Sequence, residues 1–167
     1  MLLKRMSRSI AVAAAVTGLG LASHSALATT QTGHASASIL AAITVTENTQ
    51  LNFASISAPA GGGSVVLTPA NAISGVGFTF VGTTAAGQFT ATGTATSPAV
   101  ITFSTGDTLS DGAGHTLGLG TYATDAGGTP AFDGSGNLVF HVGATLTVGA
   151  SQVAGAYTGT YSVTVNY

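Results

Sequence analysis

The C-terminal segment alternates strictly between two kinds of side chain, and this period of two most constrains the fold. From Tyr157 to Tyr167, every odd position is aromatic, β-branched or Gly, and every even position is small and polar. Successive side chains of a β-strand point to opposite faces. The pattern therefore predicts a strand that is either the last one of a β-sandwich or an element exposed for recognition. The residues expected on its apolar face are Tyr157, Tyr161, Val163, Val165 and Tyr167.

Shorter alternating segments fill most of the chain, and clusters of Gly, Pro, Asn and Asp separate them. No segment beyond residue 28 has the i, i+3, i+4, i+7 spacing of an amphipathic helix. Many short strands between turn signals are typical of an antiparallel β-sandwich or a small barrel. We therefore predict one all-β domain over 29–167, with loops at 106–114 and 125–136. The predicted strands are 35–45, 51–53, 64–68, 73–81, 88–92, 100–104, 116–122, 138–142, 144–148 and 157–167.

The first 28 residues have the organisation of a secretory signal peptide. Lys4, Arg5 and Arg8 precede an apolar run at 10–16, which is too short to span a bilayer. Small residues at 25–28 then match a cleavage site of the A-x-A type. We predict cleavage after Ala28 and export, through the periplasm, to the cell surface or the medium.

The charges that remain beyond residue 28 are all negative. The three basic residues lie in the predicted signal peptide and the five acidic residues lie after it, which gives a formal charge of −5 with His neutral. Nucleic acids and anionic lipid surfaces are bound through Lys and Arg. We therefore expect no nucleic-acid partner and no direct membrane insertion. The chain has no Cys, so its stability must come from the sheet and its core.

The sequence contains no recognisable catalytic motif. There is no G-x-S-x-G nucleophile elbow and no pair of histidines at metal-binding spacing. His34, His115 and His141 fall in the start of the chain, a loop and the polar phase of a strand, so we interpret His141 as solvent-facing. We predict no enzymatic activity and no cofactor.

One loop has a weak similarity to a calcium-binding loop. Asp133, Ser135 and Asn137 place oxygen-bearing side chains at alternate positions. The later bidentate Glu of such loops is missing, and the same residue types are common in ordinary turns. Both interpretations, a calcium loop and a turn, remain open at this point.

The start of the predicted domain suggests an interaction with other copies of the chain. The polar leader 29–34 is followed directly by the segment Ala35–Val45, whose odd positions are apolar. A sandwich whose N-terminal strand leaves its own sheet and fills a groove in a neighbour polymerises by β-strand addition. The alternative is that Ala35–Val45 is the first strand of a closed monomer.

Three stretches resemble the exported bacterial domain-of-unknown-function family DUF4402. They are the start ASASILAAITVT with LNF at 51–53, the strand GQFTATG at 87–93, and the end LVFHVGATLTV with AGAYTGTYSVTV at 154–165. That family in turn resembles Mat/Ecp-type fimbrial subunits and spore coat U-like secreted proteins. The resemblance extends over the whole chain after residue 28.

This resemblance implies an immunoglobulin-like, pilin-like sandwich that lacks one strand. It implies a structural subunit of a surface fimbria, held by a periplasmic chaperone and assembled by an outer-membrane usher. The donor strand is then expected at 35–45, with Ile39, Ile43 and Val45 as its main plugs. The end recognised by the chaperone is expected at Tyr161–Tyr167. The alternative function is a self-contained secreted β-sandwich that acts as an adhesion or binding module.

Overall fold

The computed structural model describes residues 28–167, so the predicted signal peptide lies outside the described residues except for its last position. The described chain contains β-strands and no helix. The described residues therefore include no helix that is long and apolar enough to cross a membrane. Residues 38–167 belong to one compact unit. The strands are β1 (Thr44–Thr49), β2 (Ser55–Ser57), β3 (Gly63–Leu67), β4 (Ile73–Ser74), β5 (Thr79–Val81), β6 (Gly87–Thr92), β7 (Val100–Phe103), β8 (Asp107–Ser110), β9 (Thr116–Thr124), β10 (Asn137–Val148) and β11 (Val163–Asn166).

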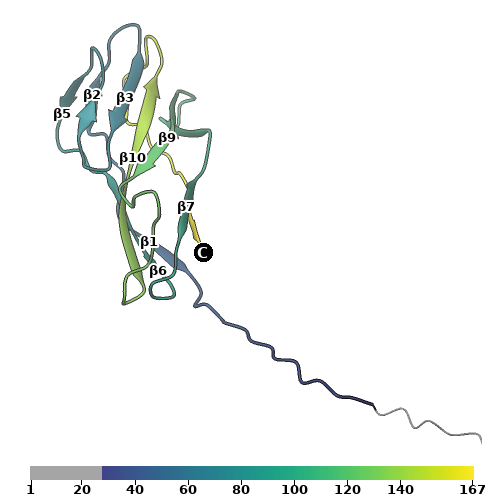
Figure 1. Cartoon of the computed structure of the whole chain (residues 1–167). Helices are drawn as coiled ribbons and strands as arrows, with labels where there is room; N and C mark the ends of the chain where they lie inside the picture. The colour runs from purple at the N-terminus through teal and green to yellow at the C-terminus, as the bar shows by residue number, and fades with distance from the viewer. Residues whose placement is uncertain (1–27) are drawn as a thin grey trace, which may run out of the picture. The chain divides into compact units, whose positions relative to one another are not determined.

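Seven strands form one antiparallel sheet, which we call the first layer. Its strand order is β1-β6-β10-β3-β4, and β9 and β8 continue it from β10. The central strand β10 pairs with β6 through residues 137–142 and with β3 through residues 144–148. Figure 1 shows β10 running through the compact unit, with β3 beside one part of it and β6 beside the other.

Strands β7 and β11 form an antiparallel pair that covers one half of the first layer. We call this pair the second layer. Its Val165 is buried in one cluster with Phe89 and Ala91 of β6 and with Phe140 and Val142 of β10. The predicted antiparallel β-sandwich is therefore confirmed.

The other half of the first layer covers a second core cluster. Val65 of β3 and Leu146 of β10 are almost completely buried there. The ribbon formed by β2 and β5 packs against this cluster through the half-buried Ile56 and Phe80. The two clusters share Tyr122 and Tyr161, which pack against both.

Gly143 lies where β10 changes partner from β6 to β3. A Cβ atom at this position would approach the carbonyl oxygen of Leu67 and the backbone of Thr68 and Pro69 much more closely than real Cβ atoms do. Only glycine therefore allows β3 to end this close to β10. The sequence suggested two strands around Gly143, but the structure has one continuous strand.

Other sequence predictions about strands are also wrong. The predicted strand 51–53 is only an isolated bridge between Asn52 and Ala85, and the predicted strand 73–81 is divided into β4 and β5, which pair with different neighbours. Residues 35–43 form no strand, and β1 begins only at Thr44. Asp107–Ser110, expected in a loop, is β8. The terminal strand covers only Val163–Asn166, and Thr158 makes a single bridge to Ser110.

Candidate functional site

The core-side face of β1 is uncovered. Val45 pairs directly with Ala91 of β6, so the two side chains share the face of the sheet that points to the second layer. Ala91 is completely buried, whereas Val45 is 37% exposed. Within the described residues, Val45 is therefore covered much less than the residue it pairs with.

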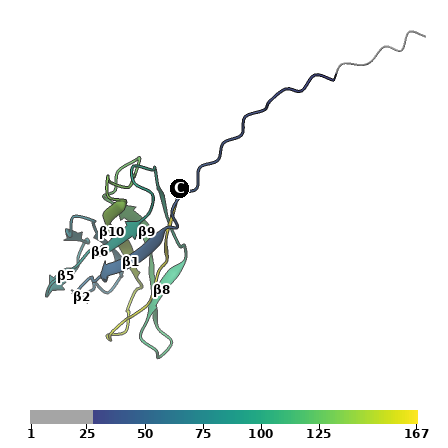
Figure 2. The same cartoon turned by 90° about the horizontal axis from the view of Figure 1, so that it is seen from below.

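The extent of the second layer explains this exposure. Tyr161, just before β11, packs against Phe89 of β6, and a Cβ on Gly93 at the other end of β6 would touch the hydroxyl of Tyr167. The segment that contains β11 therefore lies over β6 and runs in the same direction. Within the described residues β11 pairs with β7 alone, and no strand of the second layer lies over β1. Figure 2 shows β1 next to β6 at the edge of the first layer.

The backbone of β11 has a free hydrogen-bonding edge beside this gap. Ser104 N–H donates to the carbonyl of Ser162, which identifies residues 162 and 104 as a hydrogen-bonded pair. Hydrogen-bonded and non-hydrogen-bonded pairs alternate in an antiparallel ladder. The backbone groups of Val163 and Val165 therefore point away from β7. We call this edge, together with the uncovered face of Val45 and Glu47, the open seam.

Two polar groups lie in or beside the open seam. Glu47 pairs with Phe89 on the core-side face, yet it is exposed. The hydroxyl of Tyr161 is buried and has no hydrogen-bond partner in the described chain. Burial, and to a smaller extent the negative charge of Glu47, raises the pKa of Tyr161. Buried polar groups normally have partners, so this end of the seam is incompletely satisfied.

Three residues close the other end of the seam. The Tyr167 hydroxyl donates to the carbonyl of Ala41 at 2.7 Å and accepts from the Thr94 N–H at 2.6 Å. The Ala41 N–H donates to the Thr94 hydroxyl at 2.7 Å. We call this ring of hydrogen bonds the clamp. Consistent with it, the C-terminus lies near the start of β1 in both views (Figures 1 and 2).

The residues before the clamp are exposed. Residues 28–40 form no strand, and none of them is buried. Ile39 is 95% exposed and Leu40 is 45% exposed. The side chain of Ile39 is therefore almost entirely accessible to another chain.

The structure divides the predicted subunit-contact residues into three groups. Ile39 lies before the clamp, whereas Ile43 packs against the core and Val45 belongs to β1. The predicted C-terminal contact residues point mainly inward: Val165 is buried, Tyr161 and Val163 are half-buried, and Tyr167 forms the clamp. On β11 it is the backbone edge, and not these side chains, that is free.

The candidate calcium loop is a hydrogen-bonded turn. The Oδ1 atom of Asp133 accepts the N–H groups of Ser135 and Asn137, both at 2.8 Å. One carboxylate oxygen is thus occupied by the turn. Residues 28–167 contain no group of three or more His, Cys, Asp or Glu side chains placed to hold a metal.

A hollow of about 480 Å³ with mixed polar and apolar lining lies outside the seam, around His141. The ring Nδ1 of His141 is 2.7 Å from Asp125 Oδ2, and its Nε2 is 3.2 Å from the Gln88 amide nitrogen. Burial acts to raise the pKa of Asp125, but hydrogen bonds from the backbone N–H and the ring of His141 hold it below its usual value. The interpretation of His141 as solvent-facing is therefore incomplete, because its ring also contacts Asp125 and Gln88. The sequence could not indicate this, because Asp125 is sixteen residues away.

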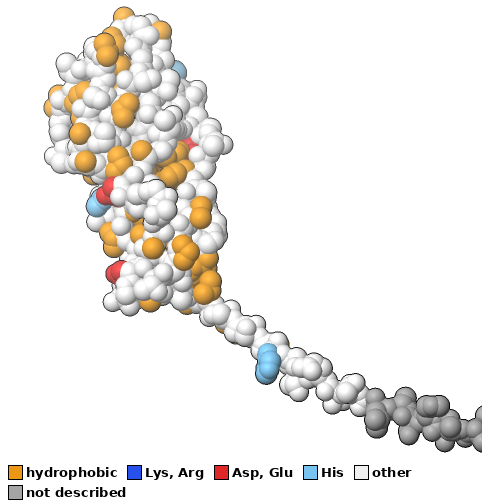
Figure 3. Space-filling model, in the orientation of Figure 1, with side chains coloured by type: hydrophobic (Ala, Val, Ile, Leu, Met, Phe, Trp, Pro, Cys, Tyr) orange, Lys and Arg blue, Asp and Glu red, His pale blue; other side chains and the backbone are white. Residues whose placement is uncertain are grey.

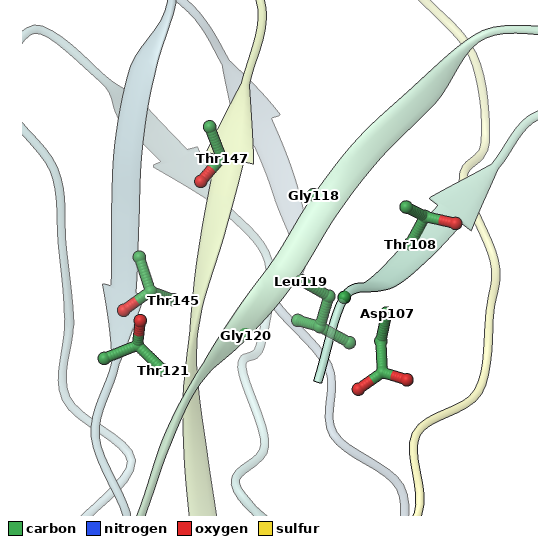
Figure 4. A pocket seen from close by; sticks show the side chains of 9 residues that line it. Asp107, Thr108, Gly118, Leu119, Gly120, Thr121, Thr145 and Thr147 are labelled. Atoms are coloured by element: carbon green, nitrogen blue, oxygen red, sulfur yellow. The ribbon is translucent and has the colours of Figure 1, made fainter. Parts of the chain in front are cut away.

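A second, smaller hollow of about 280 Å³ lies over β8, β9 and β10. Figure 4 shows Thr145 and Thr147 on β10 beside Gly118 and Gly120 on β9. Asp107 borders it, and hydrogen bonds from Ser104 and Tyr122 lower the pKa of this carboxyl. Asp107 is the only charged residue that lines the hollow, and on the face drawn in Figure 3 no Lys or Arg is visible.

The family model for the domain of unknown function DUF4402 matches residues 43–167. The chain belongs to the DUF4402 family. No curated protein and no solved structure matches it significantly. The match begins one residue before β1, so it contains the whole sandwich and leaves out residues 28–42.

Proposed function

We propose that this DUF4402 chain is a structural subunit of a surface fimbria, in which the N-terminal segment of each copy completes the sandwich of the next. The observation that carries the proposal is the exposed Val45 next to the completely buried Ala91. We interpret this difference as the position of one further strand in the second layer. A strand donated there by a neighbouring copy would complete an immunoglobulin-like sandwich.

The donated segment is 29–40. It lies before the clamp and forms no strand. The apolar side chains of Ala35, Ala37 and Ile39 alternate with the polar side chains at 36 and 38. In a neighbouring copy this segment pairs with the free edge of β11 and places Ile39 over the open seam. Backbone hydrogen bonds supply the pairing, and the apolar side chains fill the gap. Of the three plugs predicted from the sequence, Ile39 belongs to the donor, and Ile43 and Val45 belong to the receiving side.

The proposed assembly partners would act on the same open edge. An exposed strand edge next to apolar side chains pairs readily with other chains and promotes aggregation. In this proposal a periplasmic chaperone covers the seam during export, and an outer-membrane usher replaces it with the segment of the next subunit. The chaperone and the usher rest on the resemblance to fimbrial subunits.

Two complementary variants of the full chain test the proposal. Ile39→Ser removes the plug, so the variant should accept a strand but donate poorly. Val163→Pro removes an N–H from the free edge without removing a bond to β7, so it should donate but not accept. Each variant alone should refold as a monomer, and circular dichroism checks that it has folded. The two refolded together should give a 1:1 dimer.

The wild-type chain, refolded alone, should give a ladder of heat-sensitive multimers on an unheated denaturing gel. Multimers of Ile39→Ser equal to those of the wild type would show that segment 29–40 is not the donor. A wild-type chain that remains a folded monomer at high concentration would overturn the fimbrial proposal.

The second candidate function is a self-contained secreted adhesion or binding module. The hollow around His141 favours it, because its volume is in the range of small-ligand sites and Asn71, Gln88 and Asp125 converge there. This function predicts a monomer that binds its ligand without residues 29–40 and loses binding on Gln88→Ala.

A further inference from the structure

The clamp fixes the point at which the N-terminal segment leaves the sandwich. Ala41 is held through both of its backbone groups, by the Thr94 hydroxyl and the Tyr167 hydroxyl. Because Thr94 follows β6, the clamp keeps residues 41–43 in line with β1, in the first layer. Gly93 makes room for it, since a Cβ there would lie 2.8 Å from the Tyr167 hydroxyl and 2.7 Å from the Phe132 ring.

This anchoring limits what the segment can do in its own molecule. The free position beside β11 is in the second layer, and two packed sheets are about 10 Å apart. At about 3.3 Å per residue, a chain that leaves the first layer at Ala41 needs roughly three residues to cross. Residues 38–40 would make this crossing. Ile39 would then lie in the turn, and only Ala35 and Ala37 would reach the seam.

The direction of the chain adds a second limit. The segment that contains β11 runs toward the clamp, because Tyr161 contacts Phe89 and Tyr167 contacts Thr94. A segment folded back into its own seam also runs toward the clamp, so it would pair in parallel with β11. A strand from a second copy has neither limit. It can enter antiparallel, which is the slightly more stable pairing, and it can insert Ile39.

We infer that the clamp directs segment 29–40 into a second copy of the chain and away from its own seam, with Tyr167 as the positioning residue. This inference rests on the proposed function. The physical basis is general: a short connection favours exchange of an element between molecules, and a longer one lets the element fold back.

The first test is the full chain with Tyr167→Phe. This substitution removes the hydrogen bonds of the hydroxyl to Ala41 and Thr94 and keeps the ring next to Phe132. We expect the multimer fraction after refolding to fall at least fivefold in favour of a folded monomer. That monomer should depend on Ile39, so adding Ile39→Ser should lower its melting temperature. A purely structural role of Tyr167 would not make the stability of the monomer depend on Ile39.

The second test leaves the clamp intact and lengthens the connection. Four residues, Gly-Ser-Gly-Ser, are inserted between Leu40 and Ala41, so that Ile39 can reach its own seam. The multimer fraction should again fall at least fivefold. Thr94→Val is a further variant, which removes the acceptor of the Ala41 N–H and should act in the same direction as Tyr167→Phe.

The outcomes separate this inference from the proposed function. If the wild type forms multimers and the folded clamp and insertion variants form an equal fraction, the role of the clamp is overturned. The fimbrial proposal then still stands. A wild type that is monomeric overturns both. If the Tyr167→Phe chain does not fold, the multimer fraction of the insertion variant tests the inference, again with a fall of at least fivefold expected.

Discussion

Single residues hold this sandwich together at positions where two backbones approach closely. Gly143 is the clearest case, because its missing Cβ lets β3 and β6 lie on the same side of β10. Gly143→Ala should lower the free energy of unfolding by about 3 kcal/mol, as other overpacked positions do. Gly120→Ala is the matched control, because a Cβ there meets nothing within 4 Å. Equal losses in chemical denaturation would contradict this assignment.

Asp107 makes the stability depend on pH in a defined direction. Its hydrogen bonds to Ser104 and Tyr122 lower its pKa in the folded state from the usual 3.8. A group with a lowered folded pKa stabilises the protein above its unfolded pKa, and this contribution is lost as the pH falls through the folded value.

Asp107→Asn should therefore lower the melting temperature at pH 7, and its difference from the wild type should shrink below pH 4. Thermal melts between pH 7 and 2.5 check this. A difference that stays constant over this range would show that the carboxylate charge is not the cause.

The sequence predicts residue roles only where they follow from local alternation. The alternation of side chains with a period of two predicts that Val163 and Val165 point inward, and the structure confirms this. The pairing of His141 with Asp125 and Gln88 was not, because it depends on three segments brought together by the fold. The clamp was missed for the same reason, as Ala41 and Tyr167 are 126 residues apart.

Among the elements, β1 carries the functional argument. The alternation of Ala35–Val45 predicted a strand but could not say which molecule supplies its partner. The structure divides the segment: β1 pairs with its own β6, and residues 35–43 pair with no strand of the described chain. A strand pattern without a partner in its own molecule is what strand donation requires.

Val45 and Val65 provide a matched comparison between an open and a closed face. Val65 is completely buried and Val45 is 37% exposed. Val65→Thr should cost about 1–3 kcal/mol, because it buries an unpaired hydroxyl. Val45→Thr should change the stability of the isolated subunit by less than about 0.5 kcal/mol.

The same substitution should matter once a donor covers the seam. A synthetic peptide of residues 29–40 should raise the melting temperature of an Ile39→Ser chain, and less so when that chain also carries Val45→Thr. A peptide with Ile39→Ser is the control. Equal effects of the peptide on both chains would exclude Val45 from the receiving surface.

At the scale of the whole molecule, the proposed assembly of chains cleaved after Ala28 would work without basic residues. All Lys and Arg side chains lie within the first eight residues, and the five acids lie after residue 28. Subunits of this composition repel one another weakly, and salt screens that repulsion. Raising NaCl from about 50 mM to 1 M should therefore leave the multimer fraction unchanged or increase it. Loss of multimers at high salt, measured on a sizing column, would point to ion pairs between subunits.

Hydrogen–deuterium exchange of the backbone edge of β11 tests the central claim most directly. It compares wild-type multimers with the Ile39→Ser monomer and follows the peptide that contains Val163 and Val165 by mass spectrometry. We predict slow exchange in the multimers, where a donated strand bonds the edge, and fast exchange in the monomer. Fast exchange in the multimers, or equally slow exchange in the monomer, would contradict the account, because the edge of β11 would then not be where subunits join.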